Sequence, residues 1–345
     1  MKQSGLFRKP LLSRAVVLAF AVSCCGWSYA SNVNSTPFER IDYYVAKNQK
    51  KQGYPHDSVN NLHSAIFFIP LKPDANGNIT ADTASGSTFA MEVAGMRDAL
   101  TPGTKLVLGL GSLTPLVGRP AAQHAFIRNI QKLCDSYGFT GLDLDWEDFN
   151  NGNGANHAPG YSEVVKAISY SFHPEGFTIS ISFATWEAAY IPLAKAVAND
   201  VDFLNLQCYF SANNAMNMDT YQRVLADYVK AGFAARRIYV GLPTYAMVDT
   251  KKTNTSDKWR SWDQLLAARA DVVNRNQWTD PSNGATYYFS GLKLLSAKIN
   301  YAKSHGFAGI FTWELTYDTQ YRNPLSANRL IDETALLTTS PSISR

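Results

Sequence analysis

Short apolar segments of strand length recur along the chain, and helix-like segments separate most of them. The helix-like segments at 121–138, 161–172 and 221–232 carry apolar residues at spacings of three and four. Gly138 and Gly232 stand where helices of this kind usually end. Strands that are apolar at most positions and alternate with helices indicate a parallel sheet covered on its outer face. The strand-like segments are 41–46, 63–69, 105–111, 141–147, 177–183, 202–210, 237–243 and 307–314.

This alternation predicts an α/β fold, a (β/α)8 TIM barrel, with a doubly wound open sheet as the alternative. No G-x-G-x-x-G motif opens the first helix, which disfavours the open sheet. The connection 244–306 is long, so we expect a modest insertion between strands seven and eight, either a small subdomain or a substrate loop. We find no internal repeat and no appended small domain, and we predict a single barrel over residues 31–345.

The first thirty residues have a different pattern. Four basic residues flank the start of an apolar run at 15–27, and Ser28 and Ala30 are small residues at the positions that cleavage requires. This pattern is typical of a secretory signal peptide, so we expect residues 1–30 to be removed and the protein to be secreted, to the extracellular space or the periplasm. The alternatives are an uncleaved anchor, for which the run is short, and lipid attachment at Cys24.

Charge and cysteine content exclude several classes of partner. The chain carries 32 basic and 28 acidic residues, and the four additional basic residues all lie in the predicted signal peptide. The remainder is balanced, so a nucleic-acid partner is not indicated, and no other stretch is apolar enough to span a membrane. We expect Cys134 and Cys208 to be small buried hydrophobes, with a disulfide between them as the alternative. No cysteine spacing resembles a zinc site.

One predicted strand, GLDLDWE (141–147), carries acidic residues at alternate positions. Residues two apart in a strand share a face, so Asp143, Asp145 and Glu147 point to one side and the apolar residues between them to the other. In a β/α barrel the C-terminal ends of the strands face the mouth of the active site. Crowded carboxylates raise one another's pKa, as a general acid near neutral pH requires. The pattern predicts an acid–base site, with a solvated acidic edge or a magnesium cluster as alternatives.

The segment TGLDLDWE (140–147) resembles the DGxDxDxE signature of glycoside hydrolase family 18, the chitinase family. Four other segments resemble family landmarks in the same order, and together they cover nearly the whole chain after residue 30. The resemblance implies a (β/α)8 barrel that hydrolyses β-1,4-linked N-acetylglucosamine and needs no metal or organic cofactor. The four segments are HSAIFF (63–68), LNLQCY (204–209), VGLPTYA (240–246) and AKINYAKSHGFAGIFTWE (297–314).

The resemblance also implies roles for single residues. Glu147 matches the general acid, Asp145 the residue that orients the acetamido N–H of the substrate, and Asp143 its proton-sharing partner. Tyr209 matches the hydroxyl that binds the acetamido oxygen. Catalysis in this family is substrate-assisted, so the acetamido oxygen would attack C1, giving an oxazolinium ion and net retention. The candidates for sugar contact are Trp313, Tyr43, Phe68, Gln207, Trp186 and Tyr245, with Trp259, Trp262 and Trp278 of the insertion as candidates for outer subsites.

Several positions depart from the family pattern and bear on rate and substrate. They leave two alternatives open: an endo-β-N-acetylglucosaminidase acting on N-glycans, and a non-catalytic chitin-binding lectin of the same fold. The presence of Glu147 argues against the lectin, and Trp146 favours a chitinase. We expect a monomer with an open cleft whose partner is chitin or another N-acetylglucosamine glycan. The departures are Thr140 for the first aspartate, Gly109 for a serine, Phe210 for an aspartate, and Ala246 and Met247 for a Gly-Arg pair.

Overall fold

The computed structural model describes residues 37–45, 62–69, 71–147, 154–185, 190–211, 214–249, 257–319 and 322–336. The predicted signal peptide, 1–30, and the candidate Trp186 lie outside these residues. No helix in the described ranges is both long and apolar enough to cross a membrane.

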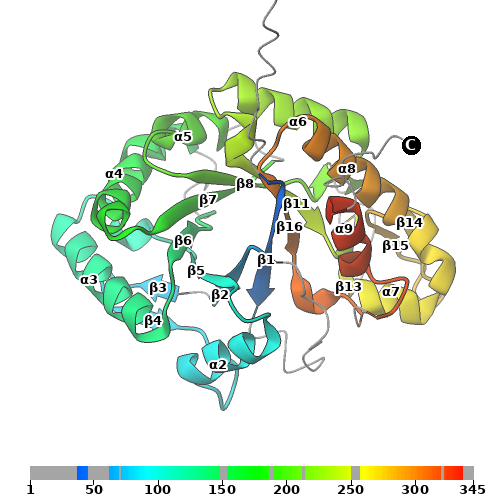
Figure 1. Cartoon of the computed structure of the whole chain (residues 1–345), viewed down its shortest axis with the longest axis horizontal. Helices are drawn as coiled ribbons and strands as arrows, with labels where there is room; N and C mark the ends of the chain where they lie inside the picture. Colours follow the sequence, from blue (N-terminus) through cyan, green and yellow to red (C-terminus); the bar gives the residue numbers. More distant parts are fainter. Residues whose placement is uncertain are drawn as a thin grey trace, which may run out of the picture. The chain divides into compact units, whose positions relative to one another are not determined.

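Parallel strands close into a barrel (Figure 1). Strand β1 (Glu39–Val45) completes the closure, because it pairs with β2 on one side and with β16 on the other. Each of the eight predicted segments overlaps one barrel strand, so the predicted fold is confirmed and the open sheet is wrong. The remaining barrel strands are β2 (Ser64–Phe68), β5 (Lys105–Leu110), β6 (Gly141–Leu144), β7 (Thr178–Ala184), β8 (Phe203–Gln207), β11 (Ile238–Pro243) and β16 (Gly309–Trp313).

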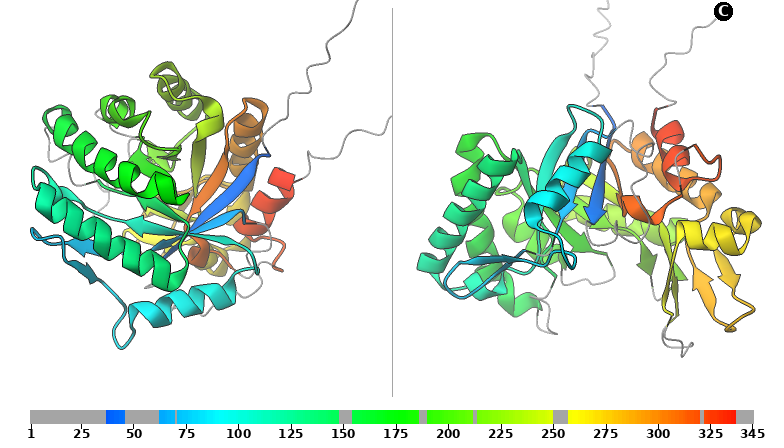
Figure 2. Two further views of the ribbon diagram at one scale, coloured as in Figure 1. Left: turned by 60° about the vertical axis from the view of Figure 1, so that its left-hand side comes forward. Right: turned by 90° about the horizontal axis from the view of Figure 1, so that it is seen from below.

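Helices surround the barrel (Figures 1 and 2). Helices α3 (Pro120–Tyr137) and α6 (Met218–Lys230) match the predicted ones closely, whereas α4 (Gly154–Phe172) begins before the predicted residue 161. Gly138 follows α3 with a φ of 66°, a left-handed conformation that glycine adopts without strain, and this ends the helix. The other helices are α2 (Phe89–Ala99), α5 (Tyr190–Val197), α7 (Trp262–Ala268), α8 (Leu292–Ser304) and α9 (Ala327–Leu336), with 3-10 turns η1 (Thr114–Leu116), η3 (His173–Glu175), η4 (Ala235–Arg237), η5 (Ala270–Asn274) and η6 (Leu315–Tyr317).

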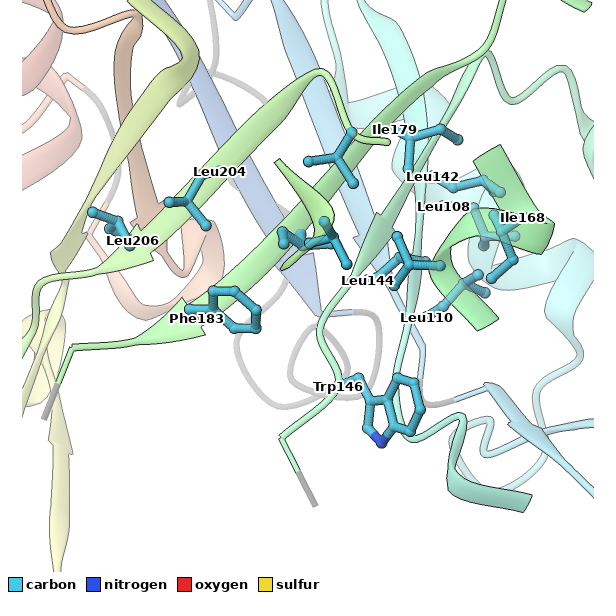
Figure 3. Close-up of a cluster of buried hydrophobic side chains, with 14 of the residues drawn as sticks. Leu108, Leu110, Leu142, Leu144, Trp146, Ile168, Ile179, Phe183, Leu204 and Leu206 are labelled. Atoms are coloured by element: carbon cyan, nitrogen blue, oxygen red, sulfur yellow. The ribbon is translucent and has the colours of Figure 1, made fainter. Parts of the chain in front are cut away.

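Apolar side chains that point outward from the strands fill the space between barrel and helices. Leu142 and Leu144 of β6 belong to this core together with Leu108 of β5 and Ile168 of α4 (Figure 3). All four are at most 1% exposed. Because successive side chains of a strand alternate, the residues between these leucines face the barrel interior. The acidic residues of GLDLDWE are on that inner face.

The long connection between β11 and α8 carries a small antiparallel sheet in the order β13-β12-β15-β14. Trp262 and Leu265 of α7 are buried in a core that this sheet shares with the barrel, and Trp262 Nε1 donates to the Leu325 carbonyl at 2.9 Å. The insertion is therefore packed against the rest of the fold. Its strands are β12 (Tyr245–Val248), β13 (Trp259–Ser261), β14 (Gln277–Thr279) and β15 (Thr286–Tyr288), and two hairpins elsewhere pair β3 (Leu71–Pro73) with β4 (Ile79–Ala81) and β9 (Phe210–Ser211) with β10 (Asn214–Ala215).

A buried ionic cluster ties the first barrel strand to the last helix. The Arg40 guanidinium of β1 lies 2.6 Å from Asp42 Oδ2 and 2.5 Å from Asp332 Oδ1 of α9. It also donates to the backbone carbonyl and the side chain of Asn328 at 3.1 and 2.6 Å. Asp42 accepts two further bonds from Thr312 of β16. Because these charges are paired in the interior, removing one of them would leave another without a partner.

Both cysteines outside the predicted signal peptide, Cys134 and Cys208, are buried and free. The expectation of two buried hydrophobes is confirmed, and the disulfide is wrong. Burial raises the pKa of each thiol to about 12.

Candidate active site

A cavity of about 500 Å³ opens at the C-terminal ends of the barrel strands. In β/α barrels this is the face that carries catalytic residues. The walls combine two carboxylates with aromatic rings, a lining that suits a sugar, whose hydroxyls need polar partners and whose C–H faces pack on rings. The cavity is lined by Phe68, Ser112, Asp145, Glu147, Gln207, Tyr209, Tyr245, Trp259 and Trp313.

The acidic residues of GLDLDWE rise from the barrel interior to the cavity. Asp143 is fully buried, Asp145 is partly buried and Glu147 is exposed. Trp146 points the other way: its ring stacks on Tyr161 of α4 at 4.7 Å and its Nε1 donates to Thr114 at 3.0 Å. The alternation inferred from the sequence therefore holds beyond the end of β6. Glu147 is the most exposed of the three, and Asp145 also lines the cavity, so a ligand there can reach both.

Asp143 lies beneath the cavity and is surrounded by hydrogen-bond donors. Its carboxylate accepts from Tyr43 and Ser180 at 2.6 Å each, from Asn205 at 2.9 Å and from Ser182 at 3.1 Å. Burial raises its pKa, while these bonds oppose the rise. Asp143 is 0% exposed, so it acts on a ligand only through its neighbours.

Gln207 links the other two carboxyl groups. Its Nε2 donates to Asp145 Oδ1 at 3.1 Å and to Glu147 Oε1 at 2.9 Å. Burial, followed by the charges of Glu147 and Asp143, raises the pKa of Asp145 well above its usual value. Asp145 therefore keeps its proton to a higher pH than an isolated aspartate does.

Tyr209 offers a buried hydroxyl that makes no hydrogen bond to the described part of the chain. The side chain is 4% exposed, and its oxygen has no hydrogen-bond partner among the described residues. Burial raises the pKa of this phenol, so it is neutral and can donate. A buried unpaired hydroxyl costs free energy, and an acceptor on a bound ligand would remove that cost.

Trp313 forms the aromatic floor of the cavity with Phe68. The two rings meet edge to face with centroids 5.5 Å apart. Thr244 fixes the backbone after Trp313. Its N–H and its hydroxyl both donate to the Trp313 carbonyl, and the hydroxyl also donates to the Glu314 carbonyl. Tyr43, expected to contact sugar, instead lies beneath this floor: it is 2% exposed, and its hydroxyl donates to Asp143.

Tyr245 and Trp259 form the wall that the insertion contributes. Their ring centroids are 5.0 Å apart, and Trp259 is 50% exposed. The sequence offered three tryptophans of the insertion without a means to choose among them. Only Trp259 lines the cavity, whereas Trp262 is buried and Trp278 stacks on Tyr287. Ser112, which also lines the cavity, was missed; its signal was a hydroxyl two residues after the end of a barrel strand.

The departures from the family pattern have structural counterparts. A Cβ at Gly109 would lie 2.7 Å from Cδ2 of Phe68, so glycine makes room for the aromatic floor. Phe210 is nearly buried against Tyr245, with centroids 5.2 Å apart. Thr140 lies at the opposite end of the barrel from the cavity, near the start of β6. Within the described ranges, no group of acidic, histidine and cysteine side chains is arranged to hold a metal ion.

A family model described as glycosyl hydrolases family 18 matches residues 39–318. Probable chitinase 10 of Drosophila melanogaster is 29% identical over 172 residues, 48% of this chain. Endochitinase 1 of Metarhizium robertsii is 25% identical over 333 residues, 80% of this chain and 72% of that protein. The chain spans only 6% of the Drosophila protein, and 30% of another relative, the killer toxin subunits alpha/beta of Kluyveromyces lactis.

Solved structures share the barrel. A chitinase from Bacteroides thetaiotaomicron matches 90% of this chain and 100% of its own, with a TM-score of 0.72 at 13% identity. A chitinase-like agglutinin from Robinia pseudoacacia matches 86% and 98%, with a TM-score of 0.63 at 16% identity. At these identities the likeness concerns the fold alone.

Proposed function

Because the chain belongs to glycoside hydrolase family 18, we propose that it is a chitinase, which hydrolyses β-1,4-linked N-acetylglucosamine in chitin or its oligomers. One observation carries the proposal. The exposed carboxyl group of Glu147 lies in the cavity and shares the Gln207 amide with Asp145. An acid that a ligand can reach, beside a second carboxyl group that retains its proton, suits protonation of a glycosidic oxygen.

In the proposed mechanism Glu147 protonates the leaving oxygen while the substrate's own acetamido oxygen attacks C1. The C1–O bond to the leaving sugar breaks, and a cyclic oxazolinium ion forms. Asp145 accepts the acetamido N–H, and the single negative charge that Asp145 shares with Asp143 stabilises the positive charge. Glu147 then removes a proton from water as that water attacks C1, which reopens the ring with net retention and restores the acid.

The unpaired hydroxyl of Tyr209 supports the role of the acetamido group. In the proposal this hydroxyl donates to the acetamido oxygen and holds it close to C1. Positioning of this kind contributes roughly 7–11 kcal/mol in favourable systems, and a general acid typically adds about 10²–10⁴-fold. Trp313 would support the apolar face of the sugar at the cleavage site.

The proposal extends to location and mode of action. Residues 1–30 direct export and are removed, and the mature protein acts outside the cytoplasm as a monomer. The half-exposed ring of Trp259 at the cavity rim supports an open cleft and cleavage within chains rather than at their ends.

The test compares the protein with its Glu147→Gln variant and with Glu175→Gln, a matched control at an exposed glutamate on η3. Each is given chitotetraose and, separately, a high-mannose glycopeptide, and products are read by mass spectrometry. We expect both the protein and the control to cut chitotetraose and Glu147→Gln to lose that activity. Cleavage of the glycopeptide alone would assign the enzyme to N-glycans. Binding of chitotetraose without any cleavage would indicate a lectin.

A further inference from the structure

A second cavity, here called the lower cavity, lies at the N-terminal end of the barrel. Its volume is about 290 Å³. Its walls include Glu39, Ser64, Lys105, Thr178 and Phe203, each the first residue of a barrel strand. The active-site cavity, by contrast, lies at the C-terminal ends of these strands. The barrel interior is thus hollow at both ends, and Asp143 lies between the two cavities.

The lower cavity reaches the donors that bind Asp143. Ser180 and Asn205 both line it. Both also donate to Oδ1 of Asp143, at 2.6 and 2.9 Å. Asn205 Oδ1 is buried and has no hydrogen-bond partner among the described residues. One layer of hydrogen-bonding side chains therefore separates the fully buried carboxylate from the lower cavity.

The lining of the lower cavity suits water. The volume is several times that of one water molecule, and several hydroxyl groups line it, which is what a hydrated cavity requires. At the mouth, His63 Nδ1 lies 3.4 Å from Glu39 Oε1, with side chains 40% and 20% exposed. Tyr239 donates to Glu39, and Lys105 supplies a positive charge nearby. Because charges of both signs are present, the site favours neither an anion nor a cation.

In the segments that the structure describes, Asp143 forms no ion pair with a basic side chain. No basic side chain is hydrogen-bonded to it in the described part of the chain, and its donors are neutral. Hydration would therefore add to the stabilisation that these hydrogen bonds already give to an ionised carboxyl group. Three titratable groups interact with Asp143 directly: Tyr43 of β1, Asp145 beyond β6 and Tyr161 of α4. The titratable groups that line the lower cavity are Glu39, His63, Lys105 and Tyr239.

We propose that the lower cavity is a hydration site that stabilises the ionised form of Asp143 from the end of the barrel opposite the substrate. Its water is hydrogen-bonded to the hydroxyl of Ser180, which in turn donates to Asp143. The consequence for rate rests on the proposed function. An ionised Asp143 keeps the proton on Asp145 and stabilises the positive charge of the oxazolinium ion.

The test fills the lower cavity without touching the acidic residues. Val107→Phe places a ring in the space, and Val107→Thr is the matched control, because it keeps the shape and adds a hydroxyl. Thr178→Phe, at an exposed position of the mouth, is the second filling variant in case the first does not fold. The titration of Asp143 is followed by ¹³C NMR of labelled aspartate, assigned with Asp143→Asn. The pH dependence of kcat/KM for chitotetraose is measured in parallel.

We expect the filling variants to shift the titration of Asp143 upward by about 0.5–1.5 pH units, a partial loss of hydration compared with full burial. The acidic limb of the kcat/KM profile should shift in the same direction with KM unchanged at the optimum. Val107→Thr should leave both unchanged. Equal titration midpoints in Val107→Phe and Val107→Thr would overturn the inference, as would a high-resolution crystal structure with no water near Ser180. If chitotetraose is not cut at all, the proposed function fails while the NMR titration still decides this inference.

Discussion

The ring of Phe68 occupies the space that a side chain at Gly109 would need. A Cβ there would lie 2.7 Å from Cδ2 of Phe68 and 3.3 Å from its Cα. The size of the residue at position 109 on β5 therefore limits where the ring of Phe68 on β2 can lie. The two residues are direct neighbours in the pairing of these strands. The serine that the family resemblance implies at position 109 does not fit this floor unless Phe68 moves.

Gly109→Ser should consequently destabilise the protein instead of restoring a lost function. Forcing extra atoms into a packed site typically costs about 1–3 kcal/mol. We expect a lower free energy of unfolding in urea and reduced turnover of chitotetraose, because Phe68 lines the active-site cavity. In the background of Phe68→Leu the same substitution should cost less. Equal costs in the two backgrounds would show that the residues are independent.

Gln207→Leu should reduce kcat with little effect on KM. The substitution removes the amide that donates to both Asp145 and Glu147. Hydrogen bonds to charged groups are worth about 1.5–3 kcal/mol, which corresponds to a loss of roughly 10- to 100-fold. Gln222→Leu, at an exposed position of α6, serves as the control. A rise in KM at constant kcat would instead make Gln207 a ligand for the ground-state sugar.

Trp259→Ala should weaken the binding of long oligomers more than that of short ones. The ring lies at the rim of the cavity, where it packs on Tyr245 and is half exposed. Aromatic packing of this kind contributes about 0.5–1.5 kcal/mol, so KM for chitohexaose should rise roughly twofold to tenfold. The ratio of KM values for chitohexaose and chitobiose within each variant is the readout. An unchanged ratio would remove Trp259 from the binding surface.

Lys298→Met should stabilise the protein at neutral pH. Lys298 of α8 is fully buried, its Nζ donates to Ser290 at 3.1 Å, and it lies over the ring of Tyr221. Burial lowers the pKa of Lys298 to about 8. Between about pH 8 and pH 10.5 the unfolded chain binds a proton here that the folded protein does not, so stability rises with pH across that window.

The variant should therefore gain about 1–3 kcal/mol at pH 7, and the gain should decline as the pH rises through this window. Urea denaturation at pH 7 and at pH 10.5 measures the difference. Lys293→Met, at an exposed position of the same helix, should show no such change. A gain of equal size at both pH values would mean that better packing, and not the charge, is responsible.

The strand alternation of GLDLDWE was readable from the sequence because it is local: a period of two assigns Asp143 and Leu144 to opposite faces without knowledge of the rest of the chain. The same holds for the barrel strands, each of which is a short apolar segment between helices. The family resemblance then directed attention to Glu147 and Tyr209, which the structure places in or beside one cavity.

Contacts between distant segments could not be predicted in this way. The bridge from Gln207 to Glu147 joins residues 60 positions apart, and its geometry depends on how the barrel closes. Tyr43 faces Asp143 instead of the cavity because Phe68 and Trp313 cover it, which no pattern on β1 reveals. The lower cavity forms where the inward-pointing side chains at the start of the barrel strands are too small to fill the interior. Hydrophobic periodicity does not show which side chains meet at that level of the barrel.

The pairing of β1 with β16, and of Arg40 with Asp332, has a consequence for synthesis and transport. The barrel cannot close until the last strand and α9 have left the ribosome, because β16, one of the two strands that pair with β1, comes more than 260 residues later in the sequence. Until then β1 lacks one of its two neighbouring strands, and Arg40 has Asp42 but not Asp332 as a charged partner. If residues 1–30 direct export as proposed, a chain that has not yet closed its barrel can pass through a translocation pore, and the barrel then forms on the far side of the membrane.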